Sequence, residues 1–239
     1  MNILFTLNDA FVPQVATCMC SIFENNKSAE NITVYLIGER ISQENQNKLK
    51  GFAKSYDRKV CIISINNIAD YIDFDFDTNG WSSIILARLF LDKLLPQEVD
   101  RILYLDGDTL VLEDIGSLFY SDLGDKVIGM CPEPTVDKSR KEFLALKEYP
   151  YHNSGVLLID LKKWRREEIG KKVIEFYQFH EGKLFAPDQD ALNGALKEQI
   201  FTLPISFNYF NIYDVYPYKT LSELSKPTKF ISHEDFNHF

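Results

Sequence analysis

The sequence has no stretch rich in lysine and arginine. Its 26 basic side chains are outnumbered by 35 acidic ones, which gives a formal net charge of −9 and a pI near 5.0. Such a surface repels nucleic acids and anionic membranes, which argues against a general nucleic-acid-binding or membrane-surface protein. A polyphosphate ligand would need a bridging metal ion, because the charge of the protein opposes it.

Long apolar runs and paired cysteines are also missing. No apolar run approaches the ~20 residues of a membrane span, and the start MNILFTLND has neither the basic region nor the cleavage site of a signal peptide. Cys18, Cys20, Cys61 and Cys131 form no CxxC pair, so we expect small buried side chains in a reducing compartment, without disulfide or zinc. We therefore expect a cytoplasmic protein, which can act at the inner face of a membrane through a partner.

Strand-like and helix-like periods alternate along the chain, which indicates an α/β fold with a mainly parallel central sheet. The 239 residues, 45% of them hydrophobic, suffice for one large core, so we expect a single domain over 1–239. The predicted strands are residues 3–6, 33–37, 60–65, 101–105, 126–130 and 155–159, and the predicted helices are 12–23, 42–56, 82–95, 138–147 and 161–179. From residue 200 onward, aromatic residues and prolines follow no helical period, which predicts an irregular region.

Two carboxylates follow the apolar segment 101–105. Asp106 and Asp108 are separated by Gly107, which lets backbone approach closely. In open α/β sheets, ligands bind in the crevice at the carboxyl ends of the strands. Carboxylate oxygens suit a hard divalent cation. The segment therefore predicts a metal site that meets a phosphorylated substrate.

The sequence contains four Asp-x-Asp triplets, and an abundant residue produces such triplets by chance. Asp73, Asp75 and Asp77 make two overlapping copies beside an Asn-Gly pair, which favours a solvated loop or an edge strand. Asp188 and Asp190 form the fourth copy, after Pro187, where carboxylates are favoured at a helix N-terminus. Only the copy at Asp106 and Asp108 follows a predicted buried strand.

Several blocks resemble, in order and over nearly the whole chain, those of glycosyltransferase family 8, in its bacterial lipopolysaccharide galactosyltransferase-like branch and the related glycogenins. The matching blocks are Ile3-Leu4-Phe5-Thr6 with Asn8-Asp9, Ala87-Arg88-Leu89, Tyr104-Leu105-Asp106-Gly107-Asp108, the run from Asn153 to Arg165, and Asp188-Gln189-Asp190 with Leu192-Asn193. The resemblance implies a single-domain GT-A fold, which is Rossmann-like. It also implies a metal-dependent retaining hexosyltransferase, which moves glucose or galactose from a UDP-sugar to a glycan or lipopolysaccharide-type acceptor.

The resemblance also implies roles for individual residues. Mn²⁺ or Mg²⁺ would be held by Asp106, Asp108 and a third ligand, for which His233 is preferred over His238, and the mixed oxygen and nitrogen ligands favour Mn²⁺. The donor would be contacted by Thr6, Leu7, Asn8, Arg88, Asp106 and Gly107, and the hexose and catalytic site would comprise Asn153, Asp188, Gln189 and Asp190. Local pattern alone equally allows Arg88 on a helix surface, Asn153 in a turn and Asp188 as a helix cap.

Two segments depart from the family pattern. Asn8 and Ala10 stand where related enzymes often carry an acidic residue and an asparagine that contact uracil and ribose, so a backbone amide at Thr6 or Leu7 would have to read the base. The C-terminal His-x-x-Gly-x-x-Lys-Pro-Trp segment of the family is not present around His233. Two explanations stay open at this point: a truncated chain, or a replaced motif.

Two other functions remain open at the level of sequence. Leu105-Asp106-Gly107-Asp108-Thr109-Leu110 resembles the nucleophile motif of haloacid-dehalogenase-like phosphatases, with the position two residues after the second Asp occupied by Leu110. A nucleotide-sugar-binding protein without turnover is the other alternative. The donor hexose, the acceptor and the oligomeric state are not determined by the sequence.

Overall fold

The computed structural model describes residues 1–225 and 236. Its described strands are β1 (Asn2–Asn8), β2 (Thr33–Glu39), β3 (Lys59–Ile65), β4 (Arg101–Leu105), β5 (Ile128–Pro132), β6 (His152–Asp160) and β7 (Ile200–Thr202). Its described α-helices are α1 (Val12–Asn25), α2 (Gln43–Ser55), α3 (Leu91–Leu94), α4 (Gly116–Phe119), α5 (Lys138–Phe143), α6 (Leu161–Arg166), α7 (Ile169–Phe179), α8 (Pro187–Leu196), α9 (Ile212–Val215) and α10 (Tyr218–Leu224).

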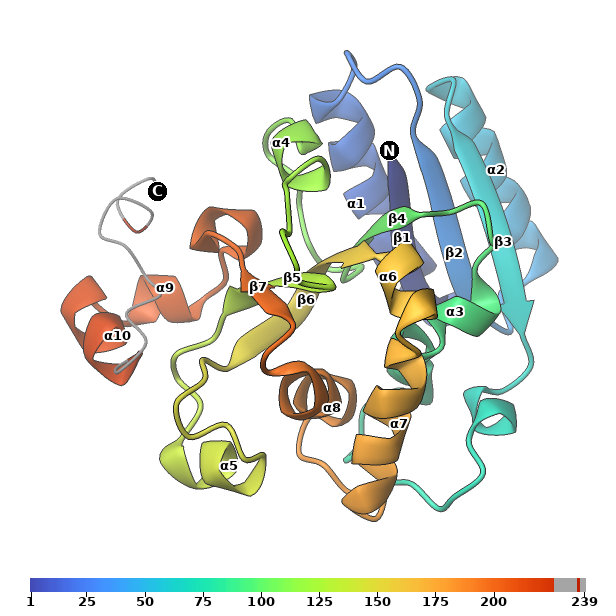
Figure 1. The fold of residues 1–239 in the computed structure, drawn as a ribbon. Coiled ribbons are helices and arrows are strands. Elements are labelled where there is room, and N and C mark those ends of the chain that lie inside the picture. The colour runs from blue at the N-terminus through green and yellow to red at the C-terminus, as the bar shows by residue number, and fades with distance from the viewer. Residues whose placement is uncertain (226–235, 237–239) are drawn as a thin grey trace.

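The seven strands form one sheet in the order β3-β2-β1-β4-β6-β5-β7 (Figure 1). β1 pairs in parallel with β2 and β4, and β2 pairs in parallel with β3. β6 runs antiparallel to both of its neighbours, β4 and β5. The expected α/β class and the mainly parallel sheet are therefore confirmed.

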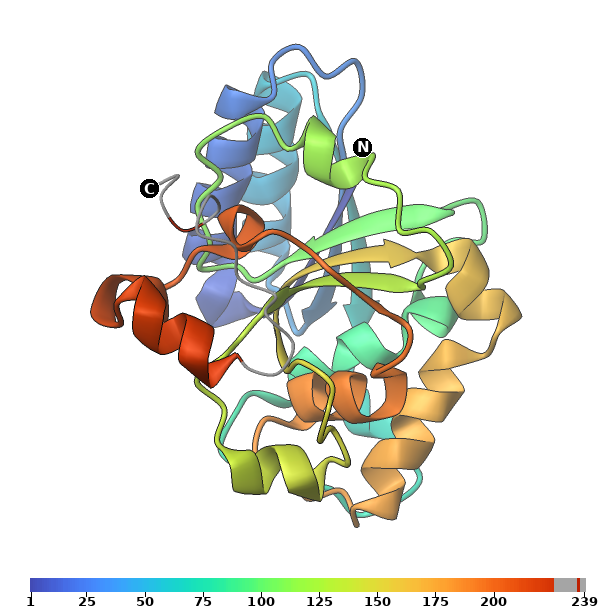
Figure 2. The same cartoon turned by 60° about the vertical axis from the view of Figure 1, so that its left-hand side comes forward.

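Helices cover both faces of the sheet, because the central strands carry apolar side chains on both faces. On β1, Ile3 and Phe5 join a core with residues of α1 and α2. Leu4 points to the opposite face and joins a second core, which contains Trp164 of α6 and Val173 of α7. Figures 1 and 2 show α1 and α2 beside each other, apart from the group of α6, α7 and α8.

Two predicted helices are interrupted. Residues 82–95 form a 3-10 helix (Ser83–Leu89) followed by the single turn of α3, and Ser82 caps without a side-chain hydrogen bond. Residues 161–179 split into α6 and α7, with Glu168 in the left-handed region at φ 52°. The break lets α7 approach α3 at Gly170, where a Cβ atom would lie 2.6 Å from Asp92 Oδ1.

Other predictions were partly wrong. β6 begins at His152, three residues before the expected start, and α5 ends at Phe143. The region after residue 200 contains β7, α9 and α10, so it is more regular than expected. The four cysteines are free, and Cys18 and Cys131 are buried as expected, but Cys61 is exposed because it lies on the edge strand β3.

Candidate functional site

A cavity of about 320 Å³ lies at the carboxyl ends of β1 and β4. Because β6 is antiparallel to β4, its amino-terminal end reaches the same edge of the sheet. The N-terminus of α8 closes the far side. The cavity is lined by ten predicted site residues: Thr6, Leu7, Asn8, Arg88, Asp106, Gly107, Asp108, Asn153, Asp188 and Gln189.

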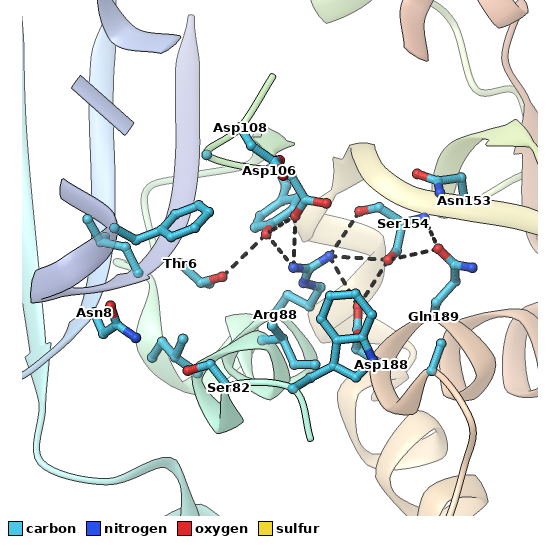
Figure 3. A pocket seen from close by; sticks show the side chains of 18 residues that line it. Thr6, Asn8, Ser82, Arg88, Asp106, Asp108, Asn153, Ser154, Asp188 and Gln189 are labelled. Atoms are coloured by element: carbon cyan, nitrogen blue, oxygen red, sulfur yellow. Dashed lines mark hydrogen bonds and ion pairs between the residues drawn. The ribbon is translucent and has the colours of Figure 1, made fainter. Parts of the chain in front are cut away.

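Figure 3 shows how these side chains are distributed along the cavity. Thr6 and Asn8 lie at one end, and Asn153 and Gln189 lie at the other. Arg88 stands between the two ends, below Asp106 in this view. The cavity therefore joins an end formed by β1 to an end formed by β6 and α8, with the Asp106 carboxylate in the middle.

The turn after β4 fixes the position of Asp106. Its backbone N–H donates to the Gly155 carbonyl at 2.8 Å, and its own carbonyl accepts from Thr109 Oγ1 at 2.8 Å. Gly107 is buried, and a Cβ atom there would lie 2.7 Å from Val15 Cγ2 of α1. The glycine is therefore needed for the packing of this turn against α1.

The Asp106 carboxylate is held through one oxygen only. Oδ1 accepts from the Tyr104 hydroxyl at 2.6 Å and from Arg88 Nη2 at 3.0 Å. Within the described residues, no hydrogen bond reaches Asp106 Oδ2 or the exposed carboxylate of Asp108. These oxygens are the hard ligands that Mn²⁺ or Mg²⁺ prefers, so the pair fits a divalent cation.

No third His, Cys, Asp or Glu joins these two carboxylates in the part of the chain that the structure describes. His233, the predicted third ligand, lies outside the described residues, as does His238. The remaining positions of a cation would be filled by ligand or water oxygens, as is usual for Mg²⁺.

Arg88 is buried, with 3% of its surface exposed, so the surface interpretation was wrong. Its guanidinium pairs with Asp106 Oδ1 at 3.0 Å and with Asp188 Oδ2 at 3.1 Å. It also donates to the Ser154 carbonyl at 3.0 Å and lies 4.1 Å from the centroid of the Tyr104 ring. One buried guanidinium thus links Asp106, just after β4, to Asp188 of α8.

Burial changes the protonation equilibria of this group. Burial raises the pKa of Asp188 above its usual range, although the positive charge of Arg88 opposes the change. Burial disfavours the Arg88 charge, but Asp188, Tyr104 and Asp106 together raise the pKa of Arg88 above its usual value. Arg88 therefore remains a permanent cation beside the cavity.

Gln189 is held in one orientation by its partners. Its Oε1 accepts from the Ser154 backbone N–H at 2.8 Å, and its Nε2 donates to Glu133 Oε2 and to the Tyr151 hydroxyl, each at 3.0 Å. A backbone N–H can only donate, so the carbonyl end of the amide must face Ser154. Gln189 therefore lines the cavity with a side chain that cannot rotate freely.

Asp190 does not line the cavity, unlike its predicted neighbours. It is 1% exposed, and its Oδ1 accepts from Arg140 at 2.7 Å and from Tyr151 at 2.6 Å. Its Oδ2 accepts from the Ala186 backbone N–H at 3.1 Å. The geometry gives Asp190 a role in anchoring the start of α8.

Asn153 lies within β6, not in a turn. Its Oδ1 accepts from the Gly155 N–H at 2.7 Å and from Asn208 Nδ2 at 2.8 Å, and its Nδ2 donates to Glu133 Oε2 at 3.0 Å.

A second hollow, of about 500 Å³, adjoins the cavity and shares Asp106, Asp108 and Asn153 with it. Tyr209 and Phe210 form the aromatic wall of this second hollow.

Sequence reasoning missed Tyr104, Ser154, Glu133 and Tyr151. Tyr104 carried a usable signal, because it stands two residues before Asp106 and side chains two apart on a strand share a face. Ser154 is only a neighbour of Asn153 in the sequence, and alternation does not place the two on one face. Glu133 and Tyr151 are brought to Gln189 by the pairing of β5 with β6, next to an irregularity after Met130. Such a tertiary contact leaves no local sequence pattern.

The family model of glycosyl transferase family 8 matches residues 2–233. The chain belongs to this family. A lipopolysaccharide 1,2-glucosyltransferase of Escherichia coli K12 is 28% identical over 215 residues, which are 87% of this chain and 62% of that enzyme. General stress protein A of Bacillus subtilis is 26% identical over 211 residues, which are 87% of this chain and 73% of that protein.

The fold is also similar to solved structures. The crystal structure of the galactosyltransferase LgtC with donor and acceptor sugar analogs has a TM-score of 0.84 and 26% identity, covering 96% of this chain and 81% of that one. This similarity confirms the expected GT-A fold. The chain spans less than two thirds of some relatives, including the Escherichia coli glucosyltransferase (62%) and a Haemophilus influenzae protein that is 29% identical (63%). No helix in the described part of the chain is long and apolar enough to cross a membrane.

Proposed function

We propose that this protein is a metal-dependent retaining glycosyltransferase. It would move a hexose, glucose or galactose, from a UDP-sugar to a glycan or lipopolysaccharide-type acceptor, with residues 1–239 as one catalytic domain. The observation that carries the proposal is the pair Asp106 and Asp108, whose free carboxylate oxygens face a cavity in a member of glycosyltransferase family 8. The relatives that act on lipopolysaccharide or galactose support the hexose and the acceptor class.

Asp106 and Asp108 would hold Mn²⁺ or Mg²⁺, and the cation would supply positive charge where the leaving diphosphate gains negative charge. Arg88 would lie near the donor and keep the Asp106 carboxylate in place beside the cation, because its guanidinium pairs with Asp106 and Asp188. Thr6, Leu7, Asn8 and Gly107 would contact the nucleotide. His233 is proposed as a third metal ligand on the resemblance alone.

Asn153, Asp188 and Gln189 would orient the hexose. Gln189 Oε1 already accepts from Ser154, and Asp188 Oδ2 accepts from Ser154 Oγ at 3.1 Å and pairs with Arg88. Neither oxygen is a free nucleophile in this arrangement. This favours front-face attack by the acceptor hydroxyl, with the leaving phosphate taking its proton, over a covalent intermediate on either side chain.

We propose that the reaction takes place in the cytoplasm or at the inner face of the membrane. An acidic protein would be held at the membrane by a lipid-linked acceptor or by a partner protein. The family match supports this reaction over the phosphatase interpretation of Asp106. The experiment below distinguishes a transferase from a nucleotide-sugar-binding protein that has no turnover.

The Asp108→Asn variant tests the proposal. Replacing one carboxylate by an amide weakens cation binding, so we expect the Mn²⁺-dependent release of UDP from the preferred UDP-hexose to fall by about a hundredfold or more. Asp125→Asn is the matched control, because the Asp125 side chain is 85% exposed and, among the described residues, forms an ion pair only with Lys126. Equal turnover in the wild type and Asp108→Asn would refute the metal role, and UDP binding without turnover in the wild type would favour the binding protein.

A further inference from the structure

Trp81 lines the cavity, yet 61% of its surface is exposed. The other tryptophan of the chain, Trp164, is fully buried. An exposed indole that lines a cavity offers apolar surface that a ligand in that cavity can cover. Within the described residues, no hydrogen bond and no ring contact involves the Trp81 side chain.

A rigid turn presents this side chain. Asn79 and Gly80 both have positive φ, at 51° and 84°, and the Trp81 N–H donates to the Thr78 carbonyl at 3.0 Å. Two positive φ values closed by such a hydrogen bond are typical of a type I′ turn, for which Asn-Gly is the preferred pair. Thr78 Oγ1 also donates to the Trp81 carbonyl at 2.6 Å, and Asp77 Oδ1 accepts from the Asn79 N–H at 2.8 Å. The Trp81 backbone is therefore ordered before any ligand binds.

The turn is attached to the end of the cavity that carries α8. Asn79 Nδ2 donates to the Phe185 carbonyl at 3.0 Å, and the Asp77 N–H donates to the Gly182 carbonyl at 2.8 Å. The segment 182–185 leads directly into α8, whose first turn contains Asp188 and Gln189. The turn that carries Trp81 is therefore tied to the proposed hexose end of the cavity.

We propose that Trp81 is the platform on which a pyranose ring of the acceptor stacks. This inference rests on the proposed transferase function and adds a specificity-determining residue to it. Arg88 and Asp188 are 3% and 5% exposed and form the floor, so the donor would occupy the deep part of the cavity. An acceptor arrives from solvent and meets the exposed side chain first.

The chemistry of a sugar suits this arrangement. One face of a pyranose presents mainly C–H groups, which an aromatic ring covers without leaving a polar group unpaired. Tyr209 and Phe210 lie near the site but already pack on Tyr213, with ring centroids 5.3 and 5.1 Å apart. Because the turn is ordered in advance, little conformational entropy is lost when the sugar binds.

Fluorescence provides the first test, because the only other tryptophan is buried. Lactose and maltose, which end in galactose and glucose, are titrated into the protein with UDP and Mn²⁺ present. We expect at least one of them to change the emission of the wild type and to leave that of Trp81→Phe unchanged. The proposal would be overturned if UDP and Mn²⁺ alone produced the whole change in emission, or if neither sugar changed the emission of the wild type.

Kinetics provides the second test. With the sugar that accelerates UDP release, Trp81→Ala should raise the acceptor KM by roughly tenfold or more while kcat changes less, and Trp81→Phe should recover part of the loss. Phe179→Ala, which removes an aromatic side chain that is 81% exposed and lies outside the cavity, should leave both constants unchanged. An unaltered KM in Trp81→Ala would refute the stacking role. Failure of the wild type to release UDP from any UDP-hexose would instead refute the proposed function.

Discussion

Tyr104 shows how one buried hydroxyl can organise the site. It donates to Asp106 Oδ1 at 2.6 Å, lies 3.3 Å from Thr6 Oγ1 and accepts from the Arg88 guanidinium. Burial raises the pKa of Tyr104 well above 10, although the charge of Arg88 opposes the change, so the hydroxyl keeps its proton. Its donation leaves Asp106 Oδ2 free for a cation.

Removing this hydroxyl should weaken metal binding. In Tyr104→Phe, the Asp106 carboxylate loses its shortest hydrogen bond. Removing a residue that holds a metal ligand by a hydrogen bond typically lowers the affinity for the metal by about 10- to 100-fold. We expect a loss in this range for Mn²⁺ measured by calorimetry with UDP present, and a fall in the free energy of unfolding of about 1–3 kcal/mol.

Tyr35→Phe is the control for this experiment. Tyr35 is 8% exposed on β2 and does not line the cavity, and no hydrogen bond to its hydroxyl occurs within the described residues. The Mn²⁺ affinity of the Tyr35→Phe variant should equal that of the wild type. Equal affinity in Tyr104→Phe as well would show that the hydroxyl does not position Asp106.

The same scale shows what sequence can predict about single residues. Ten predicted residues line one cavity because several strand ends and the N-terminus of α8 meet at one edge of the sheet, and strand ends can be recognised from apolar patterns. The buried position of Arg88 and the anchoring role of Asp190 could not be predicted, because both depend on partners that are distant in sequence. The local sequence pattern of a carboxylate at a helix N-terminus is the same whether the side chain faces a ligand or a buried arginine.

At the scale of elements, the turn after β4 depends on its contact with α1. The contact is close because Gly107 has no side chain: a Cβ atom there would lie 2.7 Å from Val15 Cγ2 and 3.1 Å from the Phe11 ring. Both neighbours belong to, or pack against, the apolar core on that face of the sheet. Gly107 therefore couples the stability of the α1 layer to the position of Asp106 and Asp108.

The variant Gly107→Ala should be destabilised. Overpacking of this kind costs about 1–3 kcal/mol, and each kcal/mol lowers Tm by about 2–4 °C in a chain of this size. The effect can be measured by thermal unfolding of the metal-free protein.

Gly51→Ala is the matched control. Gly51 lies on the exposed surface of α2, and a Cβ atom there would meet nothing within 4 Å. Because alanine favours the helix over glycine, we expect a gain of about 0.5–1 kcal/mol. A Gly107→Ala protein as stable as the wild type would contradict the packing role of this glycine.

Element boundaries were predicted well where one periodic pattern decided them. Ser42 caps α2 as expected, since its hydroxyl accepts from the Asn45 N–H at 3.3 Å. The segment 161–179 has a continuous apolar period but breaks at Glu168, three residues after Arg165, whose guanidinium donates to the carbonyls of Pro96 and Val99, both at 2.8 Å. Periodicity reports which side chains face the core and does not report such an anchor.

At the scale of the whole molecule, the sheet order brings distant parts of the chain to one cleft. β6 is inserted antiparallel between β4 and β5, and this places Asn153 and Ser154 beside Asp106. Alternating strands and helices predict the parallel part of such a sheet, but the direction of a single inserted strand depends on connections that the pattern does not specify. The class of fold was therefore predictable, and the full topology was not.

The net charge of −9 also acts at this scale. An acidic molecule repels a UDP-sugar, so donor binding should depend on the cation far more than on the few basic side chains. In the described part of the chain, Arg88 is the one arginine that lines the cavity, and Asp106 and Asp188 already offset its charge. We therefore expect donor binding, as well as turnover, to require the metal.

The most direct measurement is the release of UDP from a panel of UDP-hexoses with Mn²⁺ and without an acceptor, since slow hydrolysis bypasses the unknown acceptor. We predict release from UDP-glucose or UDP-galactose that stops when a chelator is added and resumes when Mn²⁺ is restored in excess. Release that continues at the same rate in the chelator would contradict the metal role of Asp106 and Asp108. No release from any donor, together with no thermal stabilisation by UDP and Mn²⁺, would contradict the proposed transferase function.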